Sequence, residues 1–238
     1  VNNAGGRQSY DYLRHSAWNG LTPCDLVFPF FLFIMGVSTY IALRKFSFRP
    51  SPAVVRKVLR RTVLILLIGW LLHWFDHAVD GEFFVFGSLR LTGVLPRIAL
   101  CYCIVSFMAL YLNRTALVWS AVILLALYTL LLCMFNGYEP DSTNFLNIVD
   151  KAVLGTQHLY RKGPVDPEGL ASTVSSIAHT LIGFCFGSIV FGKDTLDRKT
   201  VRIFVCGFML MASGYLLTEW LPLNKRIWSP TFVLVTCG

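Results

Sequence analysis

Three segments of the chain continue for 18 residues or more without a charged side chain, and this feature limits the fold more than any other. They are residues 26–43, with 18 residues, 115–137, with 23, and 169–192, with 24. A helix of roughly 20 apolar residues spans the hydrocarbon core of a bilayer. Each segment therefore predicts a membrane-spanning helix.

Three further segments, 54–75, 94–113 and 201–218, have shorter uncharged centres. Their terminal Lys and Arg side chains can extend toward water, which lets such helices span a bilayer. The composition agrees, because 55% of residues are hydrophobic, 14% are charged and the mean hydropathy is +0.60. We expect an all-α polytopic transmembrane bundle with six membrane helices and a truncated seventh that begins near Ile227. The single transmembrane domain would occupy 1–238 and be incomplete at both termini.

Basic residues predict the orientation, because short loops rich in Lys and Arg stay in the cytoplasm. Alternate connections contain 12 of the 21 basic residues: Arg44, Lys45, Arg49, Arg56, Lys57, Arg60, Arg61, Arg114, Lys193, Arg198, Lys199 and Arg202. The N-terminal segment and the other connections contain 11 of the 13 acidic residues and include the long segment 136–168. We expect 136–168 to be an outward-facing loop, and the net charge of +8 to be mainly a topology signal.

Other classes of partner find little support in the sequence. No basic tract is interleaved with aromatic residues outside the apolar segments, which argues against nucleic acid. The seven cysteines lie in or beside apolar segments without metal-ligand spacing, so we interpret them as small core residues and expect no metal. His73, Asp76 and His77 have the spacing of a helix face, but three interfacial polar residues explain them better than a metal or proton site.

A polar cluster precedes the first apolar segment. His15 can act as a general base or, less often, as a nucleophile. Asn19 and Asn2 could donate hydrogen bonds to a developing oxyanion, and Asp25 could orient the imidazole if the turn folds back. A structural interpretation is also open, because His is common at a helix entrance and Asp25 could cap the helix.

The remaining candidate residues have ordinary structural alternatives. Asp166 and Glu168 could cap the fifth helix. Arg90 and Arg97 could bind an anion or simply end a membrane segment. Lys225 and Trp228 are typical interfacial anchors beside Asn224. His179 lies deep in an apolar segment, where it could line a polar cavity or bond to a neighbouring helix.

The order of these stretches resembles the heparan-alpha-glucosaminide N-acetyltransferase family of membrane acetyltransferases, including its bacterial members. The similar stretches are VNNAGG at 1–6, HSAWNGLTPCDLVFPFFLFIMG at 15–36, GVLPRIALCY at 93–102, HLY at 158–160, DPEGLASTVSSI at 166–177 and NKRIWS at 224–229. Pro96 stands where the family usually has Gln.

The resemblance implies a bundle of about ten or eleven helices and transfer of an acetyl group from acetyl-CoA to the amine of a terminal glucosamine. It assigns the active-site roles to His15 and Asn2. We add Asn19 and Asp25 as catalytic candidates and Trp18, Arg97, Asp166, Glu168, Asn224, Lys225 and Trp228 as substrate-binding candidates. His15 would lie toward the periplasmic face of a bacterial inner membrane, and the basic residues between 44 and 61 could attract the CoA phosphates.

Two routes for the acetyl group stay open. An acetyl-imidazole at His15 would give ping-pong kinetics, whereas direct transfer would have His15 deprotonate the ammonium while both substrates are bound. Direct transfer is favoured because a single His stands in the motif. A transporter or flippase for sugars or lipid-linked sugars is the alternative function, and a homodimer is a further expectation.

Overall fold

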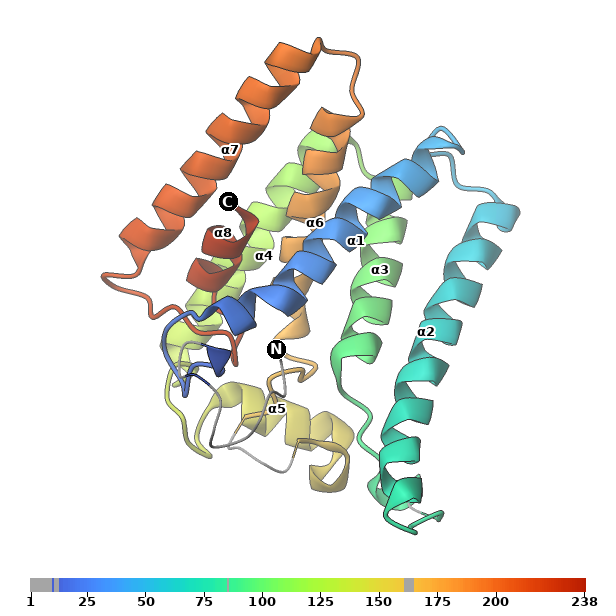
Figure 1. Ribbon diagram of the computed structural model, residues 1–238, viewed down its shortest axis with the longest axis vertical. Helices are drawn as coiled ribbons and strands as arrows, with labels where there is room; N and C mark the ends of the chain where they lie inside the picture. The colour runs from blue at the N-terminus through green and yellow to red at the C-terminus, as the bar shows by residue number, and fades with distance from the viewer. Residues whose placement is uncertain (1–9, 11–12, 85, 161–164) are drawn as a thin grey trace.

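The computed structural model describes residues 10, 13–84, 86–160 and 165–238, and every regular element in these ranges is helical (Figure 1). The elements are η3 (Pro23–Leu26), α1 (Val27–Arg44), α2 (Pro52–Val79), η4 (Phe86–Ser88), α3 (Val94–Tyr111), α4 (Arg114–Met134), α5 (Phe145–Leu154), η5 (Thr156–His158), α6 (Thr173–Val190), α7 (Leu196–Leu217) and α8 (Pro230–Cys237). The predicted all-α class is confirmed.

Six of these helices are long and apolar enough to cross a membrane: α1 together with η3, α2, α3, α4, α6 and α7. Local signals set several of their ends. Ser51 and Asn113 accept hydrogen bonds from backbone N–H groups in the first turns of α2 and α4, and Pro52 stands at the first position of α2. The apolar runs therefore predict the helices, and the capping residues place their beginnings.

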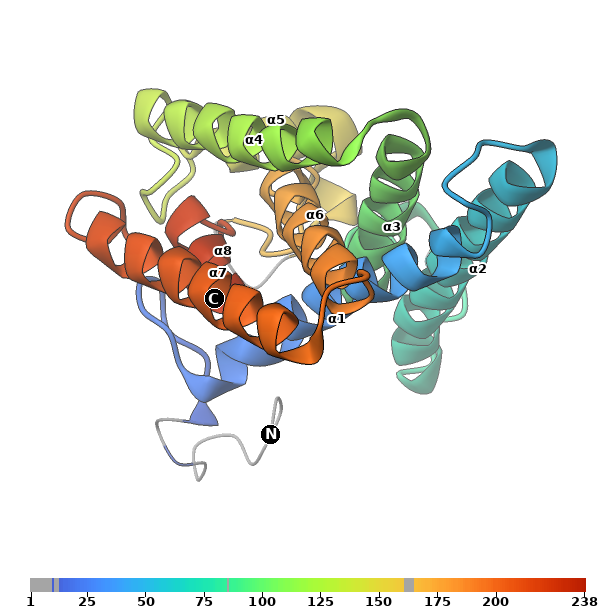
Figure 2. The same cartoon turned by 90° about the horizontal axis from the view of Figure 1, so that it is seen from above.

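Helix α6 forms the centre of the bundle, with α2 and α7 on opposite sides of it (Figures 1 and 2). It crosses α1 at very short range, because a Cβ atom added to Gly183 would lie 2.3 Å from the Phe33 carbonyl oxygen. A Cβ atom added to Gly36 would lie 2.2 Å from the Thr180 carbonyl oxygen. Small residues allow membrane helices to approach in this way, so the crossing fixes α1 and the polar residues that precede it.

The segment 136–168 contains α5 and η5, although the sequence indicates only a long polar connection. Helix α5 buries Asn147 and Asp150 while Ile148, Val149 and Val153 are exposed. Leu146 is buried as well. The apolar residues have the spacing of an amphipathic helix, but most of them face outward, so this helix is the reverse of one on a soluble protein.

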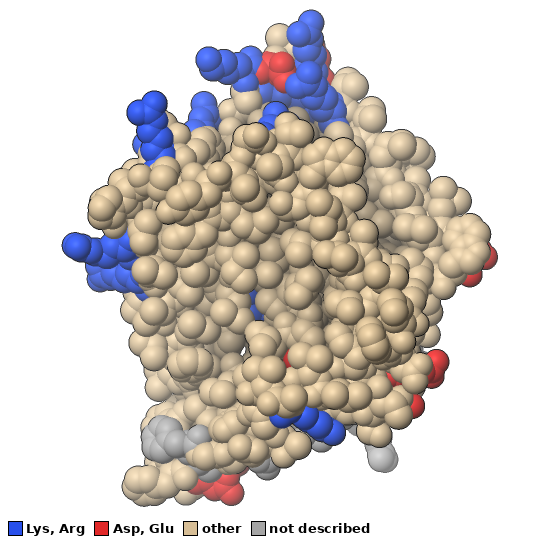
Figure 3. Space-filling model, turned by 180° about the vertical axis from the view of Figure 1, so that it is seen from behind, with Lys and Arg blue, Asp and Glu red and all other residues tan. Residues whose placement is uncertain are grey.

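Lys and Arg side chains gather at one end of the molecule (Figure 3). This is the end at which α1, α3 and α6 finish and α2, α4 and α7 begin (Figure 1). The first residues of α1, together with α5 and the start of α6, lie toward the other end (Figure 1). The charge separation that the sequence predicts along the chain is thus present in space.

Candidate active site

The side chains of His15 and Asp25 meet just before the first membrane helix. His15 Nδ1 lies 2.6 Å from Asp25 Oδ1, and the side chains are 39% and 0% exposed. The turn folds back as the sequence analysis requires, because η3 begins at Pro23 and directs Asp25 toward the preceding residues. An exposed imidazole is thereby held by a carboxylate that water does not reach.

Asp25 is fixed by groups on both sides of its turn. Its Oδ2 accepts hydrogen bonds from the backbone N–H groups of Ser16 and Thr22, at 3.2 and 3.1 Å, and from the Thr22 hydroxyl at 2.9 Å. Hydrogen bonds to the charged form of a carboxylate stabilise that form. Asp25 therefore closes its own turn and leaves Oδ1 for the imidazole.

Lys225 reaches the same carboxylate from a segment 200 residues later in the chain. Its Nζ lies 3.1 Å from Asp25 Oδ1 and 3.0 Å from His15 Nδ1. An ammonium group only donates and an ionised carboxylate only accepts. The 2.6 Å contact between His15 Nδ1 and Asp25 Oδ1 is the shortest, so we place the ring proton on Nδ1, where it is donated to Asp25. Lys225 then also donates to Asp25. The lone pair of the neutral imidazole is left on Nε2.

Further bonds attach residues 223–229 to the first motif. The Asn224 amide donates to Asn19 Oδ1 at 3.1 Å, and the Gly20 N–H donates to the Leu223 carbonyl at 2.8 Å. The side-chain oxygen of Asn224, Oδ1, accepts a hydrogen bond from the Ile227 N–H at 3.2 Å. Asn224 and Lys225, which were predicted to bind substrate, are therefore brought to His15 and Asp25 and support them.

Trp18 connects the motif to the segment 136–168. Its indole N–H donates to the Tyr138 carbonyl at 2.9 Å, and its side chain is only partly buried. The contact brings the helix α4–α5 connection beside the His15 motif. Asn2 lies outside the described residues.

Asp166 and Glu168 form a second polar cluster with Arg90. Arg90 Nη2 donates to Asp166 Oδ1 at 2.6 Å and to Glu168 Oε2 at 2.7 Å, while Thr92 Oγ1 donates to Asp166 Oδ2 at 2.5 Å. Burial alone would raise the pKa of Asp166, but Arg90 and Thr92 hold it below its usual value. The described contacts of both carboxylates are thus with their own cluster and not with His15.

Arg97 and Trp228 are buried behind the motif. Arg97 is 1% exposed, donates through Nη2 to the Gly169 carbonyl at 2.8 Å and to the Ser172 hydroxyl, and lies 5.2 Å from the centre of the Trp228 ring. Neither residue is exposed to solvent. They connect α3, the start of α6 and the segment before α8, which holds Lys225 in place.

The other sequence candidates lie apart from this site. His73 Nδ1 donates to the Arg90 carbonyl, at 2.8 Å, and His77 pairs with Glu82, at 3.3 Å. No group of three His, Cys, Asp or Glu side chains within the described ranges has metal-ligand geometry. His179 is fully buried beside the Trp228 ring, and its ring nitrogens make no hydrogen bond of normal geometry with described residues, although the Pro29 carbonyl is near.

One neighbour of His15, the Cys24 thiol, is not among the site candidates predicted from the sequence. Cys24 Sγ lies 3.8 Å from His15 Nε2, on the side of the ring opposite to Asp25. We interpreted all seven cysteines as core residues because of their apolar surroundings. The signal available in the sequence was that Cys24 directly precedes Asp25, so a turn that brings Asp25 to the imidazole also brings this thiol near it.

Comparison with known proteins agrees with the resemblance. Residues 8–156 match the family model described as heparan-alpha-glucosaminide N-acetyltransferase, catalytic. The chain is 25% identical over 291 aligned positions to the heparan-alpha-glucosaminide N-acetyltransferase of Mus musculus and 26% identical to that of Homo sapiens. Each alignment covers 98% of this chain but only 44% and 43% of the relatives, so the chain spans less than half of their length. The chain belongs to the heparan-alpha-glucosaminide N-acetyltransferase catalytic family.

Proposed function

We propose that this chain forms the membrane-embedded catalytic part of an enzyme that transfers an acetyl group from acetyl-CoA to the amine of a terminal glucosamine or a related amino sugar. The observation that carries the proposal is the bond between the exposed His15 and the buried Asp25. Family membership supplies the class of reaction, and the pairing of these two side chains supplies a base for it.

His15 would act on protons. An ammonium group is not nucleophilic, so the acceptor amine must lose a proton before or during attack on the thioester carbonyl. His15 Nε2 would take this proton, because Nδ1 donates to Asp25. Asp25, kept ionised by Lys225 and two backbone N–H groups, would stabilise the imidazolium that forms.

The other site candidates divide into two groups in this proposal. Asn19 and Trp18 lie on the exposed side of the motif, where Asn19 could stabilise an oxyanion and Trp18 could pack against a sugar ring. Arg97 and Trp228 are buried, and Asp166 and Glu168 bond to Arg90. These contacts favour supporting roles for the second group.

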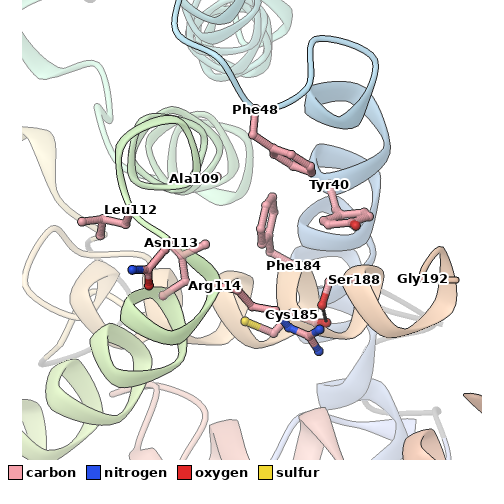
Figure 4. Close-up of a pocket in the computed structure, with 11 residues that line it drawn as sticks. Tyr40, Phe48, Ala109, Leu112, Asn113, Arg114, Phe184, Cys185, Ser188 and Gly192 are labelled. Carbon is pink, nitrogen blue, oxygen red and sulfur yellow. Dashed lines mark hydrogen bonds between the residues drawn. The ribbon is translucent and has the colours of Figure 1, made fainter. Parts of the chain in front are cut away.

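The donor would approach from the basic end of the bundle. A cavity of about 390 Å³ opens there between α1, α3, α4 and α6, with Tyr40, Phe48, Phe184 and Arg114 among its lining residues (Figure 4). Aromatic faces and an Arg guanidinium suit an adenine ring and phosphate groups. We propose this cavity as the first docking place for the nucleotide of acetyl-CoA, with the cavity facing the cytoplasm and His15 facing the periplasm of a bacterial cell.

The test compares full-length wild-type protein with His15→Ala, using labelled acetyl-CoA and glucosamine-terminated oligosaccharides. We expect the substitution to lower kcat by roughly 10²–10⁴-fold, the usual contribution of a general base. His77→Ala is the matched control, because His77 is a partly exposed histidine that pairs with Glu82 at the end of α2. Equal transfer by wild type and His15→Ala would remove His15 from the mechanism.

Two measurements, the release of free CoA and the uptake of sugar into proteoliposomes, separate the proposal from a transporter or flippase. An acetyltransferase releases one free CoA for each acetylated sugar. A transporter moves sugar into proteoliposomes without consuming the thioester, so sugar uptake without CoA release would contradict the proposal.

A further inference from the structure

Helix α2 lies at the edge of the bundle, where it packs against α3 (Figures 1 and 2). In the first half of α2, Val58 is buried, whereas Leu59, Val63 and Leu64 are exposed. A shallow groove follows this exposed face, and all of its lining residues lie within 52–64. In a bilayer, these aliphatic side chains would contact lipid.

Two arginines line the same groove. Arg56 and Arg60 are one helical turn apart, which separates them by about 6 Å along the helix axis. Both side chains are exposed. A guanidinium group presents a planar fork of N–H donors that can bind a phosphate through two parallel hydrogen bonds. The groove therefore combines two phosphate-binding groups with an aliphatic surface.

The positive charges of Arg56 and Arg60 have no carboxylate nearby along the chain. Between Asp25 and Asp76 the sequence contains no acidic residue. Within the described ranges, neither arginine forms an ion pair. Both guanidinium groups are therefore available to an anion that does not belong to this part of the chain.

The other two basic residues of α2 have contacts inside the protein. Lys57 Nζ lies 5.3 Å from the centre of the Phe46 ring, and the Arg61 guanidinium lies 4.8 Å from the centre of the Tyr102 ring. Such contacts between a cation and an aromatic face are attractive. The basic residues of α2 thus divide into a pair that packs against rings and a pair that faces outward.

The position of the outward pair along α2 agrees with the level of lipid headgroups. Helix α2 has 28 residues and is therefore about 42 Å long, whereas the hydrocarbon core of a bilayer is about 30 Å thick. Its uncharged part, 62–75, begins after both arginines. In a bilayer, the first turns of α2 would extend to the headgroups, and the aliphatic side chains that follow would lie beside the acyl chains.

We propose that this face of α2 binds one anionic phospholipid, with the phosphate between Arg56 and Arg60 and an acyl chain along Leu59, Val63 and Leu64. A zwitterionic lipid also carries a phosphate, but its own positive charge would be repelled by the two arginines. Net negative charge in the headgroup is therefore the property that the site selects. The inference goes beyond the proposed acetyltransferase function and does not depend on it.

The groove on α2 differs from the cavity proposed for the nucleotide of acetyl-CoA. The two share no lining residue. The cavity has aromatic rings, whereas every uncharged residue that lines the groove is aliphatic or proline. The groove therefore suits an acyl chain better than an adenine ring.

The experiment compares three forms of the full-length protein in detergent: wild type, the double variant Arg56→Gln and Arg60→Gln, and the double variant Arg198→Gln and Lys199→Gln. The last pair is the matched control, because it removes two positive charges at the same end of the molecule, at the start of α7 and directly after Asp197. Each form is titrated with phosphatidylglycerol and, separately, with phosphatidylcholine. Native mass spectrometry counts the bound lipids, and thermal unfolding establishes that each form is folded.

Wild type and the control should bind one phosphatidylglycerol in preference to phosphatidylcholine. The double variant at Arg56 and Arg60 should bind phosphatidylglycerol about 30-fold more weakly, because each basic residue near an anionic lipid contributes roughly fivefold in affinity. Arg60→Gln alone should therefore lose about fivefold. Added CoA or glycerol 3-phosphate should leave the lipid bound, because neither has an acyl chain.

Three results would overturn the lipid site. The first is equal affinity of all three forms for phosphatidylglycerol. The second is equal affinity of wild type for the two lipids. The third is displacement of the bound lipid by CoA or glycerol 3-phosphate at a concentration equal to that of the lipid, which would show that Arg56 and Arg60 hold a soluble phosphate.

Discussion

Asp25 illustrates how one residue can hold a site together. Its carboxylate is inaccessible to water and is surrounded by the His15 ring, the Lys225 ammonium, the Thr22 hydroxyl and two backbone N–H groups. A buried charge is tolerated when all of its hydrogen-bonding capacity is used and an opposite charge is near. The residue that orients the imidazole is therefore also the residue that fixes the local backbone.

Asp25→Asn tests this double role. The amide keeps the size of the side chain but cannot hold the Nδ1 proton of His15 as an ionised carboxylate does, and it leaves Lys225 without its anion. We expect kcat to fall about 10⁴-fold, as when the equivalent change is made in a catalytic triad, measured as acetylated sugar per minute. Asp80→Asn, at the exposed C-terminal end of α2, is the control; activity of Asp25→Asn within twofold of wild type would show that the carboxylate is not needed.

A second carboxylate makes stability depend on pH. Burial raises the pKa of Asp150 to about 6, and the bond from the Ala171 N–H only partly offsets this. Because the folded pKa lies above the unfolded value, its contribution to stability is complete below about pH 4 and is lost as the pH rises through 6. The shift corresponds to roughly 3 kcal/mol.

Asp150→Asn should remove the loss of folding stability that accompanies ionisation of Asp150 as the pH rises. The neutral amide can still accept from the Ala171 N–H, so at pH 7.5 the variant should unfold at a higher temperature than wild type, and the difference should shrink toward pH 4. Thermal unfolding in detergent at the two pH values measures it. Asp76→Asn, on the exposed surface of α2, should give the wild-type profile; a variant less stable than wild type at pH 7.5 would show that the charged form is favoured.

At the scale of elements, the crossing of α1 and α6 positions the site. The atoms nearest to Gly36 in α1 and to Gly183 in α6 are backbone atoms of the other helix. Backbone atoms cannot move aside as the end of a side chain can. Gly183→Ala should therefore separate the two helices and cost about 1–3 kcal/mol, the range for overpacking. Thermal unfolding and the yield of folded protein in detergent measure the loss.

Gly87→Ala serves as the control for that substitution. A Cβ atom added to Gly87 meets no atom within 4 Å, and this residue lies in a connection between α2 and α3. It should unfold at the wild-type temperature. If Gly183→Ala did the same, the close approach of the two backbones would not be limiting for stability.

Sequence predicts these elements unevenly, and the reasons are physical. Long apolar segments, three of them wholly uncharged, reveal the six membrane-length helices because apolar side chains are the ones that a bilayer tolerates. Helix α5 has apolar residues at helical spacing, but it is only ten residues long and lies within a polar segment, so the sequence analysis predicts only a loop over 136–168. The pairing of His15 with Asp25 was accessible from sequence, since ten residues can fold back in one turn. Lys225 could be placed among the candidates, but its contact with Asp25 depends on a tertiary fold that no local pattern encodes.

For the whole molecule, the separation of charge predicts its orientation. Lys and Arg gather at the end opposite to the His15 motif, as Figures 1 and 3 show together. The positive-inside rule predicts that this end stays in the cytoplasm, which would bring a cytoplasmic donor and an external acceptor to opposite mouths of one bundle. The orientation is therefore as important for the proposed reaction as the residues of the site.

Cysteine substitutions at the two ends test the orientation. Lys193→Cys lies in the connection between α6 and α7, and Glu139→Cys lies in the exposed connection between α4 and α5. A maleimide that cannot cross membranes should label Glu139→Cys in intact spheroplasts and should label Lys193→Cys only after permeabilisation, with the wild-type chain giving the background. Labelling of Lys193→Cys in intact spheroplasts, with Glu139→Cys protected, would invert the bundle and place His15 on the same side as cytoplasmic acetyl-CoA, so that no acetyl group would need to cross the membrane.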